Sequence, residues 1–273
     1  MLCKVMLVST SAFYAWTKAP ESTDKKTQQK QLETKVRQLF DENKQVYGSR
    51  RLSEAFIKED IQVGRFKAGR LMKKLGLEVR YPKRFKVTTD SDHHDAISPN
   101  HLNRQFDVAA PNKVWTTDMT YVWTLEGWLY VAVVIDLFSR QVVGWSIEDH
   151  MRTSLCVNAL QMAFWRRKPE PGLQHHSDRG SQYASQEYRE HLGVMKMQQS
   201  MSRKGNCWDN SPTERFFRSL KHEQLNYEKF RTKEAAKLSI IDYLAFYNGK
   251  RAHSKLGYQS PLQFEREFYK KSA

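Results

Sequence analysis

The chain has 273 residues, and its 45 lysines and arginines against 30 aspartates and glutamates give a formal net charge of +15 at pH 7. This length allows two domains with a sizeable core, and the excess of positive charge favours a polyanionic partner. The three cysteines are widely spaced and no apolar run is long enough to cross a membrane, which argues against a disulfide framework, a cysteine zinc site and a membrane protein and favours a cytoplasmic one.

The positive charge is concentrated in the first third of the chain. Residues 1–90 hold 20 lysines and arginines against 10 acidic residues, whereas the rest of the chain holds 25 against 20. Residues 1–24 begin this third with a short helical segment that carries Phe13, Tyr14 and Trp16. The first third is therefore the expected contact region for a polyanion.

Short helices are predicted between residues 25 and 82. Apolar residues at helical spacing indicate a helix over 28–44, a second that Ser49 opens over 50–59, and a third over about 65–75 that stops at Gly76. Short helices joined by tight turns are typical of a helix-turn-helix DNA-binding domain.

The third of these helices and its extension are strongly basic. Between Arg65 and Lys86 the chain has 9 lysines and arginines and a single acid, Glu78. We interpret this surface as a DNA-binding face whose contacts are mostly to phosphate and sensitive to salt, and the alternative is a solvated face without a partner. The candidate contact residues are Arg65, Lys67, Arg70, Lys73 and Lys74.

After a polar segment over 83–104, which we interpret as a linker, the pattern changes to strands. Three segments rich in β-branched and aromatic residues are expected to form hairpin-linked strands, at 114–123, 128–138 and 141–147. Asp136 ends the second strand and is interpreted as a structural acid, because a turn follows at once, and the alternative is a fourth acid of the site. The elements expected after it are a helix over 153–166, a strand before Asp178, a helix over 233–248 and a helix from Pro261 capped by Ser260.

Three acidic residues have contexts that are typical of ligands. Asp118 lies in the middle of a strand, where an acid is disfavoured unless something uses it, and Asp178 lies where a strand gives way to a glycine-containing turn. Glu214 is the third position of a helix expected to begin with Ser211 as N-cap and Pro212 as its first residue. The intervals of 59 and 35 residues between the three acids mean that only a folded domain can bring them together.

Three such carboxylates can hold a pair of Mg²⁺ or Mn²⁺ ions, because hard cations prefer oxygen ligands and leave positions open for water and phosphate. Two ions roughly 3.5–4 Å apart can promote an in-line displacement at phosphorus. The pattern predicts phosphodiester cleavage or transfer. Simpler roles stay open: Glu214 in a capping box with Ser211, Asp118 bonded to nearby threonines, and Asp178 in an Asx turn.

Basic and aromatic residues surround the third acid in the sequence. Arg203, Lys204 and Trp208 lie in the loop before the glutamate helix, and Arg218 and Lys221 share that helix's glutamate face. This loop is a candidate for holding a DNA end, with a base stacked on Trp208. The alternative is that Trp208 anchors the loop to the core.

Several stretches of the chain resemble the transposases of the insertion-sequence-three family, and more closely the product of that family's second reading frame, OrfB. They are NRQF and PNKVWTTDMTY within 103–121, IDLFSR at 135–140, HSDRGSQY at 176–183, SRKGNCWDNSPTERFFRSLK at 202–221 and YNGKRAHSKLGYQSPLQF at 247–264. The resemblance covers nearly the whole chain. It implies a DDE transposase related to retroviral integrases, with Asp118, Asp178 and Glu214 as the catalytic triad and Lys221 as a basic residue that contacts DNA.

The resemblance also implies an α/β fold: an RNase H-like catalytic domain over 105–268, with a mixed sheet flanked by helices, after a small all-α helix-turn-helix domain. The expected activity is cleavage of the ends of an insertion sequence and transfer of the 3′ hydroxyl to target DNA. The expected cofactors are two Mg²⁺ or Mn²⁺ ions. The expected partners are double-stranded DNA, further copies of the chain and an upstream-frame (OrfA-type) protein, in a bacterial cytoplasm.

Two other functions stay open. One is a non-enzymatic DNA-binding remnant or regulator of an element that needs the upstream-frame partner. The other is an RNase H-type nuclease that acts on hybrids.

Overall fold

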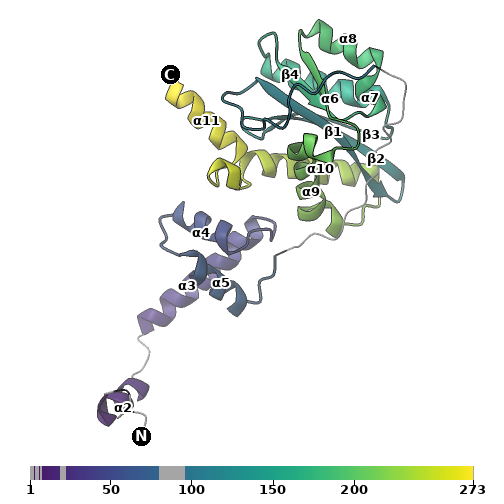
Figure 1. Cartoon of the computed structure of the whole chain (residues 1–273). Helices are drawn as coiled ribbons and strands as arrows, with labels where there is room; N and C mark the ends of the chain where they lie inside the picture. Colours follow the sequence, from purple (N-terminus) through teal and green to yellow (C-terminus); the bar gives the residue numbers. More distant parts are fainter. Residues whose placement is uncertain (1–2, 4–5, 7, 19–22, 80–95, 273) are drawn as a thin grey trace. The chain divides into compact units, whose positions relative to one another are not determined.

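The structure, a computed structural model, describes residues 3, 6, 8–18, 23–79 and 96–272. It forms two compact units, Met1–Val79 and Arg80–Ala273, the first helical and the second built on a sheet (Figure 1). Most of the predicted linker over 83–104 lies outside the described residues. None of the described helices is long and apolar enough to cross a membrane.

The first unit contains the predicted short helices. They are α2 (Thr10–Lys18), α3 (Thr23–Glu42), α4 (Ser49–Ile57) and α5 (Arg65–Lys74). Residues at helical spacing on α3, α4 and α5 form a shared core, and they include the buried Val36, Leu39, Phe40, Leu52, Phe56, Ala68, Leu71 and Met72. The apolar periodicity thus predicted these helices correctly, with ends that differ by a few residues.

The second unit is organised around one five-stranded sheet in the described residues. The strands are β1 (Val114–Thr124), β2 (Gly127–Asp136), β3 (Val142–Glu148), β4 (Gln174–Ser177) and β5 (Gln198–Met201), in the spatial order β3-β2-β1-β4-β5. The strands β1, β2 and β3 pair in antiparallel fashion, whereas β4 pairs in parallel with both β1 and β5. The predicted mixed sheet is confirmed, and β1 is its central strand.

Helices pack around this sheet and complete the α/β fold (Figure 1). They are α6 (Thr153–Arg167), α7 (Ser181–Ala184), α8 (Gln186–Val194), α9 (Ser211–Glu223), α10 (Lys233–Gly249) and α11 (Pro261–Ser272). The main core joins Trp115, Val134 and Val143 of the sheet to Leu155 and Leu160 of α6. Helices α7 and α8 and strand β5 were not predicted from the sequence.

The linker prediction is wrong at its C-terminal end. The described residues from 96 onwards belong to the second unit, and Leu102 is only 2% exposed. The Ser200 hydroxyl of β5 accepts hydrogen bonds from the backbone N–H groups of His101 (3.0 Å) and Leu102 (3.2 Å). The segment has the polar composition of a linker. Its packing was not predicted because its partners lie about a hundred residues further along the chain.

Asp136 has the structural role that the sequence suggested. Its buried carboxylate accepts hydrogen bonds from the backbone N–H of Asn112 (2.7 Å), the indole of Trp115 (3.2 Å) and the backbone N–H of Phe138 (2.9 Å). These bonds hold the turn after β2 against the start of β1, and they satisfy both carboxylate oxygens of Asp136.

Candidate active site

The pairing of the two parallel strands directs Asp178 towards Asp118. Trp115 of β1 is paired with His175 of β4, and Thr116 with His176. The same offset, continued past the end of β4, sets Asp178 beside Asp118. Each carboxylate is also held locally: Asp118 accepts a hydrogen bond from the backbone N–H of Met119 (2.8 Å), and Asp178 from that of Gly180 (2.9 Å).

Helix α9 brings Glu214 to the same strand. The side chain of Asn210 donates a hydrogen bond to the Thr117 carbonyl oxygen (3.0 Å), and the hydroxyl of Thr213 donates one to the Thr116 hydroxyl (2.7 Å). These buried contacts fix the first turn of α9 against the residues that immediately precede Asp118 in β1. The apolar side of the helix, with Phe216, Phe217 and Leu220, is buried.

The predicted start of this helix is wrong by one residue. Ser211 is the first helical residue, and Asn210 occupies the N-cap position without a side-chain capping hydrogen bond. The alternative role of Glu214 in a capping box with Ser211 is therefore wrong, because both residues lie one position further into the helix than that motif requires. Glu214 lies in the first turn of α9, and its exposed side chain does not cap the helix.

The three acidic residues influence one another electrostatically. Burial raises the pKa of Asp118 well above its usual range, the negative charge of Asp178 raises it further, and Glu214 adds to the effect. Although the Glu214 side chain is exposed, its neighbours remove part of its hydration, which raises its pKa, and the negative charge of Asp178 raises it further. The structure thus brings together the three carboxylates that the sequence singled out.

A cation would relieve this repulsion, and the donor set fits a hard divalent ion. In the part of the chain that the structure describes, no group of three histidine, cysteine, aspartate or glutamate side chains is arranged to hold a metal ion. Mg²⁺ does not need such a cage, because it usually keeps several waters and is held by one or two carboxylates together with substrate phosphates. The oxygen-only set of Asp118, Asp178 and Glu214 suits this mode of binding.

The predicted DNA-contacting residues near the site lie in different environments. The Nζ atom of Lys221 lies 5.1 Å from the centre of the Tyr121 ring, and burial lowers the pKa of Lys221 while Asp118 opposes that shift. Trp208 is 70% exposed, so the alternative in which it anchors the loop to the core is wrong. Lys204 and Arg218 are exposed, and the guanidinium group of Arg203 bonds Asp209.

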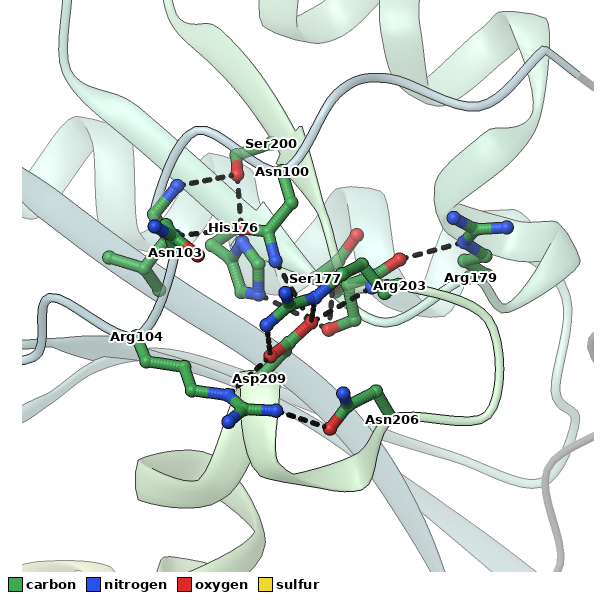
Figure 2. Close-up of polar contacts among 12 residues, drawn as sticks. Asn100, Asn103, Arg104, His176, Ser177, Arg179, Ser200, Arg203, Asn206 and Asp209 are labelled. Carbon is green, nitrogen blue, oxygen red and sulfur yellow. Dashed lines mark hydrogen bonds and ion pairs between the residues drawn. The ribbon is translucent and has the colours of Figure 1, made fainter.

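The buried Asp209 is the centre of a polar network that was not predicted from the sequence (Figure 2). The acid stands in the WDN stretch, which carried the family resemblance without a role for Asp209 itself. An acid between tryptophan and asparagine in a polar loop resembles a solvated charge. Its partners Asn100 and Arg104 are more than a hundred residues away, so only the fold reveals them.

The basic residues predicted for the first unit lie on the side of α5 that faces away from the core. Arg65, Lys67, Arg70, Lys73 and Lys74 are all exposed on α5, whereas Ala68, Leu71 and Met72 of the same helix are buried. The Lys74 ammonium also forms an ion pair with Glu33 of α3, with an N–O distance of 2.7 Å.

Comparisons with known proteins agree with this architecture. An "HTH-like domain" family matches residues 27–85, and two "Integrase core domain" families match residues 108–207 and 195–261. The "Insertion element IS600 uncharacterized 31 kDa protein" of Shigella sonnei is 39% identical over 273 residues, which are 100% of both chains. "Transposase InsF for insertion sequence IS3A" of Escherichia coli (strain K12) is 37% identical over 97% of this chain and 92% of its own.

The fold is also similar to that of a retroviral protein in a solved structure. A chain of the simian T-cell lymphotropic virus intasome matches with a TM-score of 0.51 and 15% identity, over 80% of this chain and 70% of the viral one. The likeness at this level of identity is one of fold. Relatives that match along nearly the full chain, together with the helix-turn-helix and integrase core families, establish that this chain belongs to the IS3 family of transposases.

Proposed function

We propose that this transposase is a metal-dependent polynucleotidyl transferase whose catalytic carboxylates are Asp118, Asp178 and Glu214. The observation that carries the proposal is their convergence: a mid-strand acid, the acid after the neighbouring parallel strand, and the acid in the first turn of the helix bonded to that mid-strand segment. The raised pKa values of Asp118 and Glu214, to which the negative charge of Asp178 contributes in both cases, support this convergence.

The three carboxylates would hold the divalent ions together with water and DNA phosphate, and the surrounding backbone sets the orientation of the two aspartates. Asp118 and Asp178 are each fixed by a backbone N–H bond, whereas the exposed Glu214 can adjust to the ions and the DNA. When bound, two Mg²⁺ or Mn²⁺ ions activate the attacking oxygen and stabilise the leaving oxygen at phosphorus. Lys221 supplies a positive charge for a DNA phosphate beside the acids.

The reaction has two steps at phosphorus. In the first, water attacks the phosphodiester at the end of the element, the bond from phosphorus to the 3′ oxygen breaks, and a 3′ hydroxyl is released. In the second, that hydroxyl attacks a phosphodiester of the target DNA, so one P–O bond forms as another breaks. A covalent protein–DNA intermediate is not required, unlike in mechanisms with a serine or tyrosine nucleophile.

Each of the two units contacts double-stranded DNA in a different place. The exposed basic residues of α5 contact the element's ends, mostly through phosphate, and Arg203, Lys204, Trp208 and Arg218 contact DNA near the acids. Joining two ends to one target requires at least two copies of the chain in the active complex. An upstream-frame protein of the OrfA type is a further partner.

Substitution of single carboxylates tests this assignment. Asp118→Asn and Asp178→Asn should each lower the rate of strand cleavage at least about a thousandfold, equal to roughly 4 kcal/mol of transition-state stabilisation. Binding of the same DNA, measured by fluorescence anisotropy, should stay within about twofold, because phosphate contacts elsewhere dominate affinity. Glu187→Gln, an exposed acid on α8, is the control and should cleave normally. Near-normal cleavage by either aspartate variant would refute the assignment.

A further inference from the structure

One buried carboxylate organises the loop that precedes the glutamate helix. Asp209 is 0% exposed and lies in η1 (Cys207–Asn210), directly before α9. Arg203 bonds both carboxylate oxygens through its guanidinium group, at 2.8 and 2.9 Å, and donates its backbone N–H at 3.0 Å. Arg104 adds a bond at 2.8 Å and Asn100 one at 2.9 Å. We call these four residues the Asp209 clasp (Figure 2).

The clasp joins segments that are distant in the sequence. Arg203 lies near the start of the loop over 202–210 and Asp209 lies near its end, so their bonds close the loop on itself. Arg104 also donates a hydrogen bond to the Asn206 side chain in the middle of the loop (2.8 Å), which ties the loop to the segment before β1. The positive partners, Arg203 foremost, hold the pKa of Asp209 well below its usual range, so the clasp is fully charged at neutral pH.

The start of the loop is bonded to the turn that carries Asp178. The backbone N–H of Ser202 donates to the Ser177 carbonyl oxygen (2.9 Å), and the guanidinium group of Arg179 donates to the Ser202 carbonyl oxygen (2.7 Å). Ser177 and Arg179 flank Asp178 in the sequence. The segment clasped by Asp209 therefore begins beside one proposed catalytic carboxylate.

The end of the loop leads directly to a second proposed catalytic carboxylate, Glu214. Asn210, next to Asp209, bonds the Thr117 carbonyl oxygen of β1, and Glu214 follows one turn later. Because α9 lacks a side-chain cap, its first turn is positioned by these preceding residues. Asp209 thus lies five residues before Glu214, on the segment that leads there from beside Asp178, and its bonds to Arg104 and Asn100 help to secure that segment to the rest of the unit.

We propose that Asp209 is a positioning residue for strand cleavage, which fixes the loop over 202–210 so that Glu214 faces Asp118 and Asp178. The inference rests on the proposed catalytic role of those three acids. Asp209 itself touches neither DNA nor metal. It acts through the placement of α9.

The test compares Asp209→Asn with the wild-type chain by cleavage kinetics and by amide hydrogen exchange. The amide in place of the carboxylate removes the charge and presents donors to Arg203 and Arg104, so the clasp should open. We expect kcat for metal-dependent cleavage to fall at least about tenfold, equal to roughly 1.4 kcal/mol, while the Kd for DNA changes less than about twofold. Amides over 203–214 should exchange faster, and those of β1 and β2 should be unchanged.

Arg104→Gln provides a milder variant in case Asp209→Asn does not fold. Its side chain is 44% exposed, so the fold should tolerate the change, and a smaller fall in kcat with faster exchange over 203–214 is expected. The matched control is Glu265→Gln in α11. It also breaks a buried ion pair, with Arg167 (2.6 Å), and should lower the melting temperature without lowering kcat.

Each outcome decides for or against the positioning role. Normal kcat in both clasp variants despite faster exchange would overturn it. So would an equal decrease of kcat in Glu265→Gln at the same decrease of melting temperature, because the effect would then be one of stability alone. Glu214→Gln is assayed in parallel: if it retains cleavage, the proposed function itself fails, whereas its inactivity beside fully active clasp variants contradicts only the role of Asp209.

Discussion

His175 and His176 are buried in β4, next to the candidate active site, although a charged histidine is costly to bury. The Nε2 atom of His175 is 2.8 Å from the Tyr188 hydroxyl, and the ring of His176 bonds the hydroxyls of Ser200 and Ser202. Burial lowers the pKa of His175 to about 3 and that of His176 to about 4. Both rings are therefore neutral in the folded protein at pH 7.

The buried state of His175 predicts a loss of stability in acid. Its ordinary pKa is 6.5, so between about pH 6.5 and pH 3 the unfolded chain binds a proton that the folded chain does not. This contribution to the free energy of unfolding is fully present above pH 6.5 and is lost as the pH falls, by up to about 1.4 kcal/mol for each pH unit. Urea unfolding at pH 7 and pH 5 should show a smaller decrease for His175→Gln than for the wild type. Equal decreases would show that His175 is not buried in its neutral form.

The residues of the site differ in how far the sequence alone could identify them. The context of Asp118 in a strand and of Asp178 at a turn marked them as unusual acids, and the resemblance to a family grouped them with Glu214. The register that sets β4 beside β1 was not readable, because four residues with the sequence QHHS carry no pairing signal. Asp209 was missed for a related reason: its burial depends on Arg104 and Asn100, which local patterns do not connect to it.

At the scale of elements, the packing of α6 across the sheet depends on one glycine. A Cβ atom added to Gly144 of β3 would lie 2.3 Å from the carbonyl oxygen of Ala159 and 2.7 Å from the Cβ atom of Ala163. Both atoms belong to α6, and the first is backbone, so neither can move aside without displacing the helix. Gly144 is present because the strand and the helix approach each other too closely for any side chain.

Gly144→Ala should therefore destabilise the second unit. Overpacking of this kind costs about 1–3 kcal/mol in the free energy of unfolding, which urea denaturation can measure. Gly193→Ala in α8 is the control, because an added Cβ atom there meets nothing within 4 Å and alanine is favoured over glycine in helices. Equal free energies of unfolding for the two variants would contradict the close approach of α6 to β3.

Element prediction succeeded where apolar periodicity is strong and failed where it is weak. The alternation of β-branched and aromatic residues identified β1, β2 and β3 to within two residues, and helical spacing identified α6 and α10. Strand β5 has the sequence QQSM, which contains one apolar residue and no β-branched residue, and it is held by pairing with β4. It is a strand because of its tertiary contacts, and contacts with β5 likewise hold residues 96–104 in the second unit.

At the scale of the whole molecule, positive charge is unevenly divided between the two units. The exposed basic residues of α5 lie in the first, where Phe66 is 76% exposed beneath the guanidinium group of Arg65, 4.7 Å from the ring centre. The three acidic residues of the candidate active site, Asp118, Asp178 and Glu214, lie in the second unit. This division predicts that DNA affinity and DNA cleavage can be altered separately.

Removing charge from α5 should weaken binding without altering the chemistry. For the pair Arg70→Gln and Lys73→Gln, the slope of log K against log salt concentration should become shallower by roughly 0.9 for each DNA phosphate that the variant no longer neutralises. Lys74→Gln should have a smaller effect because Lys74 is paired with Glu33. Lys270→Gln on α11 is the control outside this unit. Fluorescence anisotropy between 50 and 200 mM salt, about the range in which such contacts weaken strongly, makes the measurement. An unchanged slope in the double variant would contradict a DNA-binding face on α5.

The most direct test of the central claim is a cleavage assay on labelled duplex DNA that carries the element's own ends. The wild-type chain, with the upstream-frame protein supplied, is compared with Glu214→Gln in the presence and absence of Mg²⁺ or Mn²⁺. We predict metal-dependent nicking at the ends by the wild type and none by the variant, with both proteins binding the DNA. Equal nicking by Glu214→Gln, or salt-sensitive binding by the wild type with no nicking in either metal, would contradict the assignment of the three carboxylates.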